Sequence, residues 1–462
     1  MGGAQQRPGI VPSWAPWAVL LVGAVLRLLR LDDWSLWEDE ETSIYFALNP
    51  DRQFARSFPL FFWLLGRLYA VTGVSVYGGR LLVALTGIAT LWLAYRTARR
   101  FCGDAVALVA LMALVLSVGH IFWSQSIRYY MLVLAFQMLS IHEFLNGLQQ
   151  PAFRSWLLAV LWLLLGMATH LSAALLAPVY GVFWTLTLLR SGAARHRGLT
   201  VIAFSVVIMG VSALGLYLLT ALSGTMSFQT SPLPVGVLVR LVAYGGVPAC
   251  GLALLACFSR ERRSPAFAFW VLLVAVPLVE IVVIHRLNLW YAVWNHAMVS
   301  MVGIAVLAGY GGLALERSVP RRAALTVGCL AVGASLLLVV LYFTAAHGDR
   351  PRWRDATLAL QRDMVHRAGA RPDIYADVPG VVAHYLAVPP GETMGHPSVH
   401  QPDRRVPQPT VGRESYYVVE KRLLALQTAA WFREQCAEIG RFPARLIVRD
   451  RTVLVYRCSA MP

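Results

Sequence analysis

Eleven runs of about 20 mostly apolar residues follow one another along the first three quarters of the chain. A helix of about this length crosses the hydrocarbon layer of a membrane. Hydrophobic residues make up 58% of the chain and charged residues 14%, which is too apolar and too poor in charge for an ordinary soluble domain. We therefore expect a polytopic α-helical membrane protein. The expected spans are 14–31, 80–98, 104–123, 129–147, 155–170, 171–189, 199–221, 237–258, 266–285, 292–315 and 323–346.

One further apolar segment, residues 58–72, is not counted as a span. It is short, and Arg67 stands near its middle. An arginine at the centre of a bilayer costs about 2.5–3.5 kcal/mol on insertion scales. A helix that lies in the membrane interface avoids this cost, so we predict an interfacial helix here.

The arginines form short clusters, and each cluster follows an even-numbered span. The clusters lie within residues 96–100, 190–197, 260–263 and 317–322. All four therefore fall on one face, which the positive-inside rule assigns to the cytoplasm. The net charge of +16 is spread over these loops without a basic stripe interleaved with aromatic residues, so the sequence gives no reason to expect nucleic-acid binding.

This orientation places the acidic loop 32–79 and the tail from residue 347 outside the cytoplasm. The tail is rich in charge and proline, with helical patterns over 352–368 and around 422–436 and strand-like segments at 373–378, 416–421, 445–450 and 452–457. Alternating helix and strand signals predict a small α/β domain. The expected organisation is a transmembrane module, residues 1–346, followed by an extracytoplasmic domain, residues 347–462.

The six cysteines form neither a disulfide framework nor a metal motif. Cys436 and Cys458 both lie in the tail, and they could pair if the tail is outside the cytoplasm. Connectivity cannot be read from spacing, so the sequence leaves this pairing open.

The densest negative charge of the chain lies in "DDWSLWEDEETSIYFAL", residues 32–48. Glu38, Asp39, Glu40 and Glu41 are either a solvated rim or a site where scarce water and neighbouring carboxylates raise a pKa and allow proton transfer. Successive residues of a helix lie about 100° apart, so one or two of the four acids can face a common pocket. We expect the others to be solvated.

Other polar residues on the same predicted face invite two interpretations. Arg128, in "SQSIRYY", is either an ordinary loop arginine or a phosphate ligand beside aromatic rings. Arg286, His285 and His296 allow the same pair of interpretations. His170, at the end of an apolar run, could be a metal ligand, although no spaced His/Glu motif accompanies it.

The chain contains no P-loop, Rossmann glycine pattern, CxxC pair or HExxH motif. Nothing in it therefore indicates ATP, NAD or haem. Acids and arginines at the outer rim of a membrane protein suggest a substrate that is already in the membrane, such as an anionic lipid carrier.

The first loop contains "SLWEDEETS" (35–43), and "FPLFFWLL" (58–65) follows it. These segments resemble the first-loop motif and the juxtamembrane helix of the GT-C fold membrane glycosyltransferases that use polyprenyl-phosphate sugars, which include protein O-mannosyltransferases and lipid A aminoarabinose transferases. The order and spacing of the motifs extend the resemblance over most of the chain. The remaining matches are 79–103, "WSQSIRYYML" (123–132), "GMATHLSAALLAP" (166–178) and "RWRDATLAL" (352–360).

The resemblance implies roles for particular residues. The catalytic aspartate of the family falls on Asp39, with Glu40 beside it. Arg128, together with Arg286 and Arg80, would bind the donor phosphate. Three further residues would contact substrate or a metal, namely Tyr130, His170 and His296. The family's usual histidine or acid before the juxtamembrane helix is replaced here by serine, which leaves a divalent metal and any other cofactor open.

The function implied is transfer of a sugar from a polyprenyl-phosphate donor to a lipid, glycan or protein acceptor of the cell envelope. The reaction would take place on the extracytoplasmic face of the inner membrane, with inversion and with Asp39 as general base. The alternative is a transporter or flippase of lipid-linked sugars. Such a protein would carry acids and arginines on both faces and show repeat symmetry, and the sequence displays neither.

Overall fold

The computed structural model describes residues 11–150, 152–191, 210, 234–286, 294–366, 372–386, 399–400, 414–424, 426–446 and 449–459. Contacts divide the chain into two units. The helical unit comprises Met1–Leu29, Gln53–Phe61 and Leu81–Val339, and the mixed unit comprises Arg30–Arg52, Phe62–Arg80 and Val340–Pro462. Most of the acidic first loop thus falls in the same unit as the tail. The domain division at residue 346 stays a prediction.

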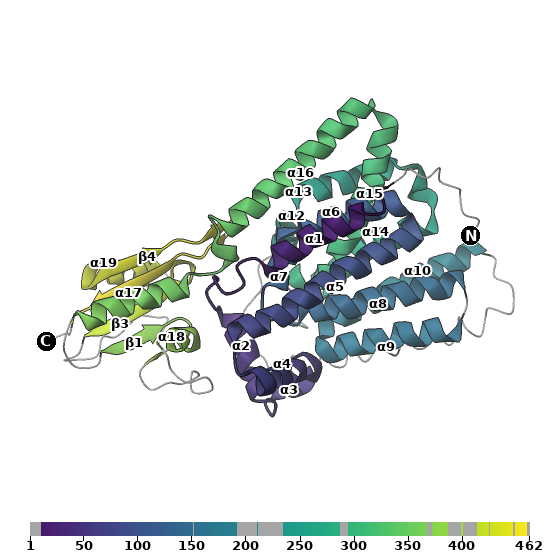
Figure 1. Cartoon of the computed structure of the whole chain (residues 1–462). Coiled ribbons are helices and arrows are strands. Elements are labelled where there is room, and N and C mark those ends of the chain that lie inside the picture. The colour runs from purple at the N-terminus through teal and green to yellow at the C-terminus, as the bar shows by residue number, and fades with distance from the viewer. Residues whose placement is uncertain are drawn as a thin grey trace. The chain divides into compact units, whose positions relative to one another are not determined.

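The helical unit consists of apolar helices, many of which run side by side (Figure 1). Pro277 lies in the interior of one of them, α14. The helices are α1 (Ala15–Leu28), α3 (Gln53–Ser57), α5 (Val76–Cys102), α6 (Asp104–Val115), α7 (Val118–Ser124), α8 (Tyr130–Gln149), α9 (Phe153–Thr169), α10 (Leu176–Ser191), α12 (Pro234–Gly245), α13 (Val247–Leu255), α14 (Pro265–Arg286), α15 (Met298–Ser318) and α16 (Arg321–Phe343).

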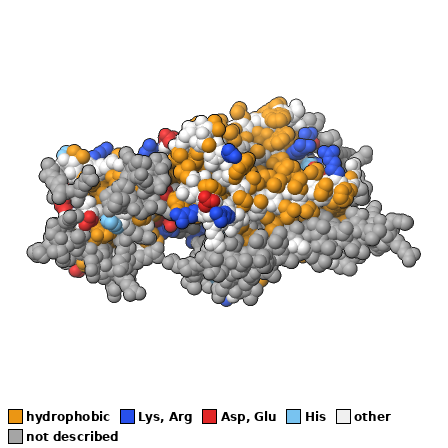
Figure 2. Space-filling model, turned by 90° about the horizontal axis from the view of Figure 1, so that it is seen from below, with side chains coloured by type: hydrophobic (Ala, Val, Ile, Leu, Met, Phe, Trp, Pro, Cys, Tyr) orange, Lys and Arg blue, Asp and Glu red, His pale blue; other side chains and the backbone are white. Residues whose placement is uncertain are grey.

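Apolar helices stand where the sequence predicts spans, except at 199–221, which lies outside the described residues save for Gly210. Within the described ranges, five helices are long and apolar enough to cross a membrane, and counting each of two bent pairs as one span gives seven. The helices α1 and α9 are shorter, as is the apolar segment Leu171–Thr187. Figure 2 shows hydrophobic side chains over much of the described surface, as a lipid-facing protein requires.

Two predicted spans are broken instead of continuous. The predicted span 104–123 is α6 followed by α7, with a bend of 63°, and Ser117 begins the second helix by accepting a hydrogen bond from the amide of His120. The predicted span 237–258 bends by 100° at Gly246, whose φ of +103° favours glycine. Hydropathy averages over such breaks, which is why the sequence shows one run in each case.

The predicted interfacial segment 58–72 forms α4 (Pro59–Thr72), a helix of 14 residues. At about 1.5 Å per residue it is too short to cross a bilayer of about 30 Å. The helix itself is confirmed, and its position in the interface stays a prediction.

The mixed unit contains a five-stranded sheet in the order β2-β1-β3-β7-β4. β1 pairs in parallel with β2 and β3, and the remaining pairs are antiparallel. The strands are β1 (Asp373–Ala376), β2 (Val399–His400), β3 (Ser415–Glu420), β4 (Cys436–Phe442) and β7 (Val453–Cys458). The helices are α2 (Glu38–Leu48), α17 (Trp353–Val365), α18 (Pro379–Tyr385) and α19 (Leu426–Gln435).

The predicted α/β character of the tail is confirmed, with two differences in detail. The strand-like segment 445–450 is a pair of two-residue strands, β5 (Arg445–Leu446) and β6 (Arg449–Asp450), which form a separate small sheet. β4 was missed because "CAEIGRF" mixes charge and glycine, and no alternation of apolar and polar residues marks it.

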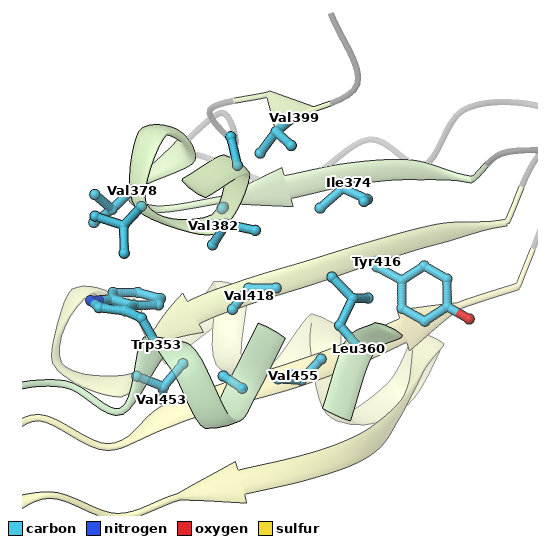
Figure 3. Packing of buried hydrophobic residues seen from close by; sticks show 14 of the residues in the cluster. Trp353, Leu360, Ile374, Val378, Val382, Val399, Tyr416, Val418, Val453 and Val455 are labelled. Carbon is cyan, nitrogen blue, oxygen red and sulfur yellow. The ribbon is translucent and has the colours of Figure 1, made fainter. Parts of the chain in front are cut away.

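Buried apolar side chains from α17 and α18 pack on one face of the sheet (Figure 3). Trp353 and Leu360 come from α17, and Val382 comes from α18. Leu36, from the first loop, is 1% exposed and belongs to the same cluster. The loop that carries the acidic residues is therefore part of the hydrophobic core of the mixed unit.

Candidate functional site

The four acids of the first loop form the first turn of α2, which begins after Trp37 in extended conformation. Carboxylates are stabilised at this end of a helix by its dipole. Their exposure differs strongly, because the helix turns each side chain toward a different environment. Glu38 is exposed, Asp39 is half-buried, Glu40 is fully buried and Glu41 is 7% exposed.

Glu40 forms a buried ion pair with Arg80, which lies in the first turns of α5. The Nε and Nη2 atoms of Arg80 donate to the two carboxylate oxygens of Glu40 at 2.9 and 2.6 Å. The other three donors of Arg80 reach backbone carbonyls of Leu31, Trp34 and Ser35 at 2.8–3.0 Å. All five N–H donors of the guanidinium are thus engaged by the first loop.

Arg350, at the start of the tail, approaches the same carboxylate. Its Nε lies 3.9 Å from Oε2 of Glu40, and its side chain is fully buried. Its Nη1 donates to the carbonyl of Gly348 at 2.9 Å. Gly348 and its neighbours His347 and Asp349 all have φ between +49° and +63°, a left-handed turn that brings Arg350 back toward the loop.

Glu41 lies against α18. A Cβ atom at position 380 would stand 2.6 Å from Oε1 of Glu41, so any larger residue there would displace this carboxylate. The nearby amide of Leu36 donates to the hydroxyl of Tyr385 at 2.6 Å. The expectation that the non-catalytic acids are solvated holds for Glu38 and is wrong for Glu41, because α18 covers the turn.

The surroundings of Glu38 raise its pKa. Neighbouring segments displace water from its carboxyl group, although the side chain keeps exposed surface, and Asp39 adds a second negative charge. Arg451 and Arg422 of the tail act in the opposite direction. Of the four acids, Asp39 combines partial exposure with a position one residue from the Glu40–Arg80 pair.

In the helical unit, Arg128 lies among aromatic rings. It is 9% exposed, and its guanidinium stands 4.7 Å from the ring centre of Tyr129 and 5.9 Å from that of Tyr130. Its Nη2 donates to the hydroxyl of Tyr129 at 3.1 Å. Stacking on aromatic faces holds the planar guanidinium in one orientation.

His170 and His296 join this group. His170 stacks on Tyr129 at 4.2 Å between ring centres, and His296 lies 5.2 Å from His170 and 6.2 Å from Tyr130. The Nδ1 of His170 accepts from the amide of Ser172, which assigns its proton to Nε2. We call Arg128, Tyr129, Tyr130, His170 and His296 the arginine–aromatic cluster.

The structure therefore brings together four of the residues singled out from the sequence, namely Arg128, Tyr130, His170 and His296. Arg286 is exposed at the end of α14, just before residues outside the described part. Sequence reasoning missed Tyr129 and Arg350. Tyr129 is adjacent to Arg128 in "IRYY" and could have been included on that signal, whereas Arg350 has no distinguishing pattern around it.

Metal binding was left open by the sequence. In the ranges that the structure describes, no three His, Cys, Asp or Glu side chains form a group that could hold a metal ion. His170 and His296 form a pair of rings without a third such ligand in those ranges, a set smaller than the three protein ligands of the usual catalytic zinc site.

Comparison with known proteins provides a sequence match and several structural matches. Residues 56–214, about a third of the chain, match the model of the dolichyl-phosphate-mannose-protein mannosyltransferase family. A comparison with curated protein sequences found no match.

Among solved structures, ArnT from Cupriavidus metallidurans in the apo state has a TM-score of 0.55 at 15% identity, covering 96% of this chain and 98% of that one. The same protein bound to undecaprenyl phosphate has a TM-score of 0.54 at 15% identity, with 98% and 100% covered. The Archaeoglobus fulgidus oligosaccharyltransferase in complex with Zn and sulfate has a TM-score of 0.55 at 12% identity, covering 84% of this chain and 62% of that one.

The fold is thus the GT-C fold of membrane glycosyltransferases, and the predicted resemblance to the polyprenyl-phosphate-sugar-dependent members is confirmed. More narrowly, the family match over residues 56–214 and the fold support a similarity to multi-pass membrane glycosyltransferases.

Proposed function

We propose that this protein transfers a sugar from a polyprenyl-phosphate donor to a hydroxyl group of an envelope lipid, glycan or protein. The mannosyltransferase family match supports the reaction class. The solved ArnT complex, whose ligand is undecaprenyl phosphate, supports a lipid-phosphate donor. The proposal is carried by the arrangement of the acidic turn. Glu40 is neutralised by Arg80, whereas the side chain of the adjacent Asp39 is only half-buried.

We assign the general-base role to Asp39. Its carboxylate takes the proton of the acceptor hydroxyl as the oxygen attacks the anomeric carbon. The bond between that carbon and the phosphate oxygen breaks on the opposite side, and the phosphate leaves with the electron pair. One displacement of this kind, through an oxocarbenium-like transition state, inverts the anomeric centre.

Arg128 is the proposed ligand of the donor phosphate. Arg128 is 9% exposed and lies among aromatic rings, so its guanidinium has little competition from water and stabilises a leaving phosphate more strongly than a surface arginine would. His170 and Tyr130 surround it with polar atoms and flat faces suited to a sugar phosphate.

Glu40 and Arg80 act in this proposal as positioning residues. Because every donor of Arg80 is engaged by the first loop, its geometry favours a role in holding α2 over the phosphate-binding role expected from the sequence. Arg350 and Tyr385 attach the same loop to the tail, so the tail helps to orient Asp39.

The proposed side of the membrane is the extracytoplasmic one. Cys436 and Cys458 form a disulfide between β4 and β7, in the same unit as Asp39. Disulfides persist in oxidising compartments, which supports a location outside the cytoplasm. The arginine clusters support the same orientation from the opposite face.

The test is a transfer assay in proteoliposomes with polyprenyl-phosphate-linked sugars of defined identity and a panel of envelope acceptors. We expect wild-type protein to release free polyprenyl phosphate together with a glycosylated acceptor, and Asp39→Asn to release neither. Movement of the intact donor across the bilayer without cleavage, unaffected by Asp39→Asn, would instead establish the transporter.

A further inference from the structure

A cavity of about 470 Å³ lies in the helical unit, at the end where its arginine clusters gather. The end of α5, the starts of α6 and α14, and parts of α8, α10 and α15 surround it. Arg99 and Arg100 line it together with Glu261, which pairs with Arg317 at 2.7 Å. Arginines of the 96–100 cluster therefore line this cavity, Arg317 of the 317–322 cluster pairs with one of its lining residues, and the proposed function uses none of them.

The rim of the cavity carries excess positive charge. Arg99 is neutralised by Asp104 at 2.6 Å, and Glu261 by Arg317. Arg100 stands over the ring of Phe101 at 5.8 Å, and within the described residues it has no carboxylate partner. One guanidinium charge is thus left uncompensated at the mouth.

The floor of the cavity is apolar and tightly packed. Phe269 and Trp270 close its base and are fully buried, whereas Leu148 and Ala266 line it with partly exposed apolar surface. The indole nitrogen of Trp270 already donates to the sulfur of Cys102 at 3.0 Å, so the floor offers little to a polar ligand. A ligand that matches both regions is anionic at one end and hydrocarbon at the other.

We propose that this cavity binds a phosphate-bearing lipid, with the phosphate beside Arg100 and the first part of a hydrocarbon chain against Leu148 and Ala266. Basic pockets between transmembrane helices suit anionic lipid head groups. The start of α14 at Pro265 also borders the cavity, and the dipole of a 22-residue helix places a partial positive charge there. This site is separate from the arginine–aromatic cluster, which none of its lining residues belongs to.

The experiment uses the full-length protein in nanodiscs of phosphatidylcholine with increasing phosphatidylglycerol, and counts retained phosphatidylglycerol by native mass spectrometry. We expect Arg100→Gln to weaken the tightest phosphatidylglycerol site about tenfold, the effect of losing one charge-assisted hydrogen bond. Arg96→Gln is the matched control, because it removes the same charge from an exposed position four residues earlier on α5, outside the cavity. We expect it to change the affinity less than twofold.

A second variant tests the apolar wall of the cavity without changing its charge. Ala266→Phe, at the cavity wall, should weaken lipid retention as much as Arg100→Gln does, while the unfolding temperature of both variants stays near that of the wild type. Glycerol phosphate in solution should not displace the lipid.

Equal losses in Arg100→Gln and Arg96→Gln would overturn the proposal, because they would indicate attraction to the surface as a whole. Displacement by glycerol phosphate would overturn the lipid assignment in favour of a soluble phosphate compound. Unchanged retention in both cavity variants would also overturn it.

Discussion

Glu40 and Arg80 join the first turn of α2 to the first turns of α5 through two hydrogen bonds, and neither side chain is exposed to solvent. A buried pair of this kind gains little net stability over apolar residues, since both charges lose their hydration. Its effect is to exclude other arrangements, because each partner alone would be a buried charge. The position of Asp39 follows from this pair, one residue away on the same turn.

Breaking the pair from one side should be costly. We expect Glu40→Gln to lower the free energy of unfolding by about 3–5 kcal/mol, because it leaves Arg80 and Arg350 without their shared carboxylate. The control is Asp104→Asn, which breaks the exposed pair with Arg99 and should cost less than about 1 kcal/mol. Denaturation of the purified proteins measures both. Similar losses in the two variants would show that burial does not determine the strength of this pair.

Removing the proposed base should affect catalysis more than folding. We expect Asp39→Asn to lower kcat at least about 100-fold, the usual contribution of a general base, with little change in unfolding temperature because the side chain is half-buried. Glu38→Gln, one residue earlier and exposed, should keep nearly full activity. A comparable loss of kcat in Glu38→Gln would contradict Asp39 as the sole general base. Either Glu38 would share that role, or the turn would act through its total charge.

Arg128 and Arg286 are the two candidate phosphate ligands, and kcat/KM for the donor should distinguish them. We expect Arg128→Gln to lower kcat/KM for the donor about 100-fold, since a mostly buried, ring-stacked guanidinium is lost. Arg286→Gln removes an exposed charge at the end of α14 and should change kcat/KM less than about threefold. Measurement over a range of donor concentrations decides between them, and the reverse ranking would place the phosphate near the end of α14.

The disulfide of the tail can be tested directly. Cys436 and Cys458 should resist alkylation until a reductant is added, whereas mass spectrometry should find the other four cysteines already reduced. Cys436→Ser should destabilise the mixed unit by about 3 kcal/mol, as expected for a loop of this size. Alkylation of both cysteines in untreated protein from native membranes would argue against an extracytoplasmic tail.

His347 should make folding sensitive to acid. Burial, aided by the charge of Arg352, lowers the pKa of His347 to about 4, and its Nε2 accepts from the amide of Ser35 at 3.4 Å. The unfolded chain has the higher pKa, about 6.5, so it binds a proton first as the pH falls. The contribution of neutral His347 is therefore complete above about pH 6.5 and is lost between there and about pH 4.

We expect the wild type to lose about 2–3 kcal/mol more stability than His347→Gln between pH 7 and pH 4. Unfolding temperatures of the two proteins across this range provide the measurement. Parallel pH profiles would show that His347 is protonated equally in both states.

Much of the fold could be predicted because a helix that crosses a membrane appears in the sequence as a long run of high hydropathy. The spans 129–147 and 266–285 coincide closely with α8 and α14. The breaks at Ser117 and Gly246 were missed, since local capping and a single backbone angle do not alter the mean hydropathy of a run. β4 was missed because an edge strand with exposed charge lacks a periodic pattern.

The candidate site was predictable in its residue types more than in its contacts. Helical geometry limited the number of acids that can act together, and the resemblance selected Asp39. The sequence could not show that Glu41 is buried against Gly380, or that the donors of Arg80 are all engaged, because both contacts join segments far apart in the chain.

The sequence alone determined that this chain is a helical membrane protein with an acidic turn and an α/β tail, because length, hydropathy and charge are properties of local segments. Only the tertiary structure decided which acid is neutralised, which arginine stands among aromatic rings, and that the first loop shares a core with the tail. These depend on long-range packing, where burial makes an unpaired charge costly and so selects one arrangement of partners.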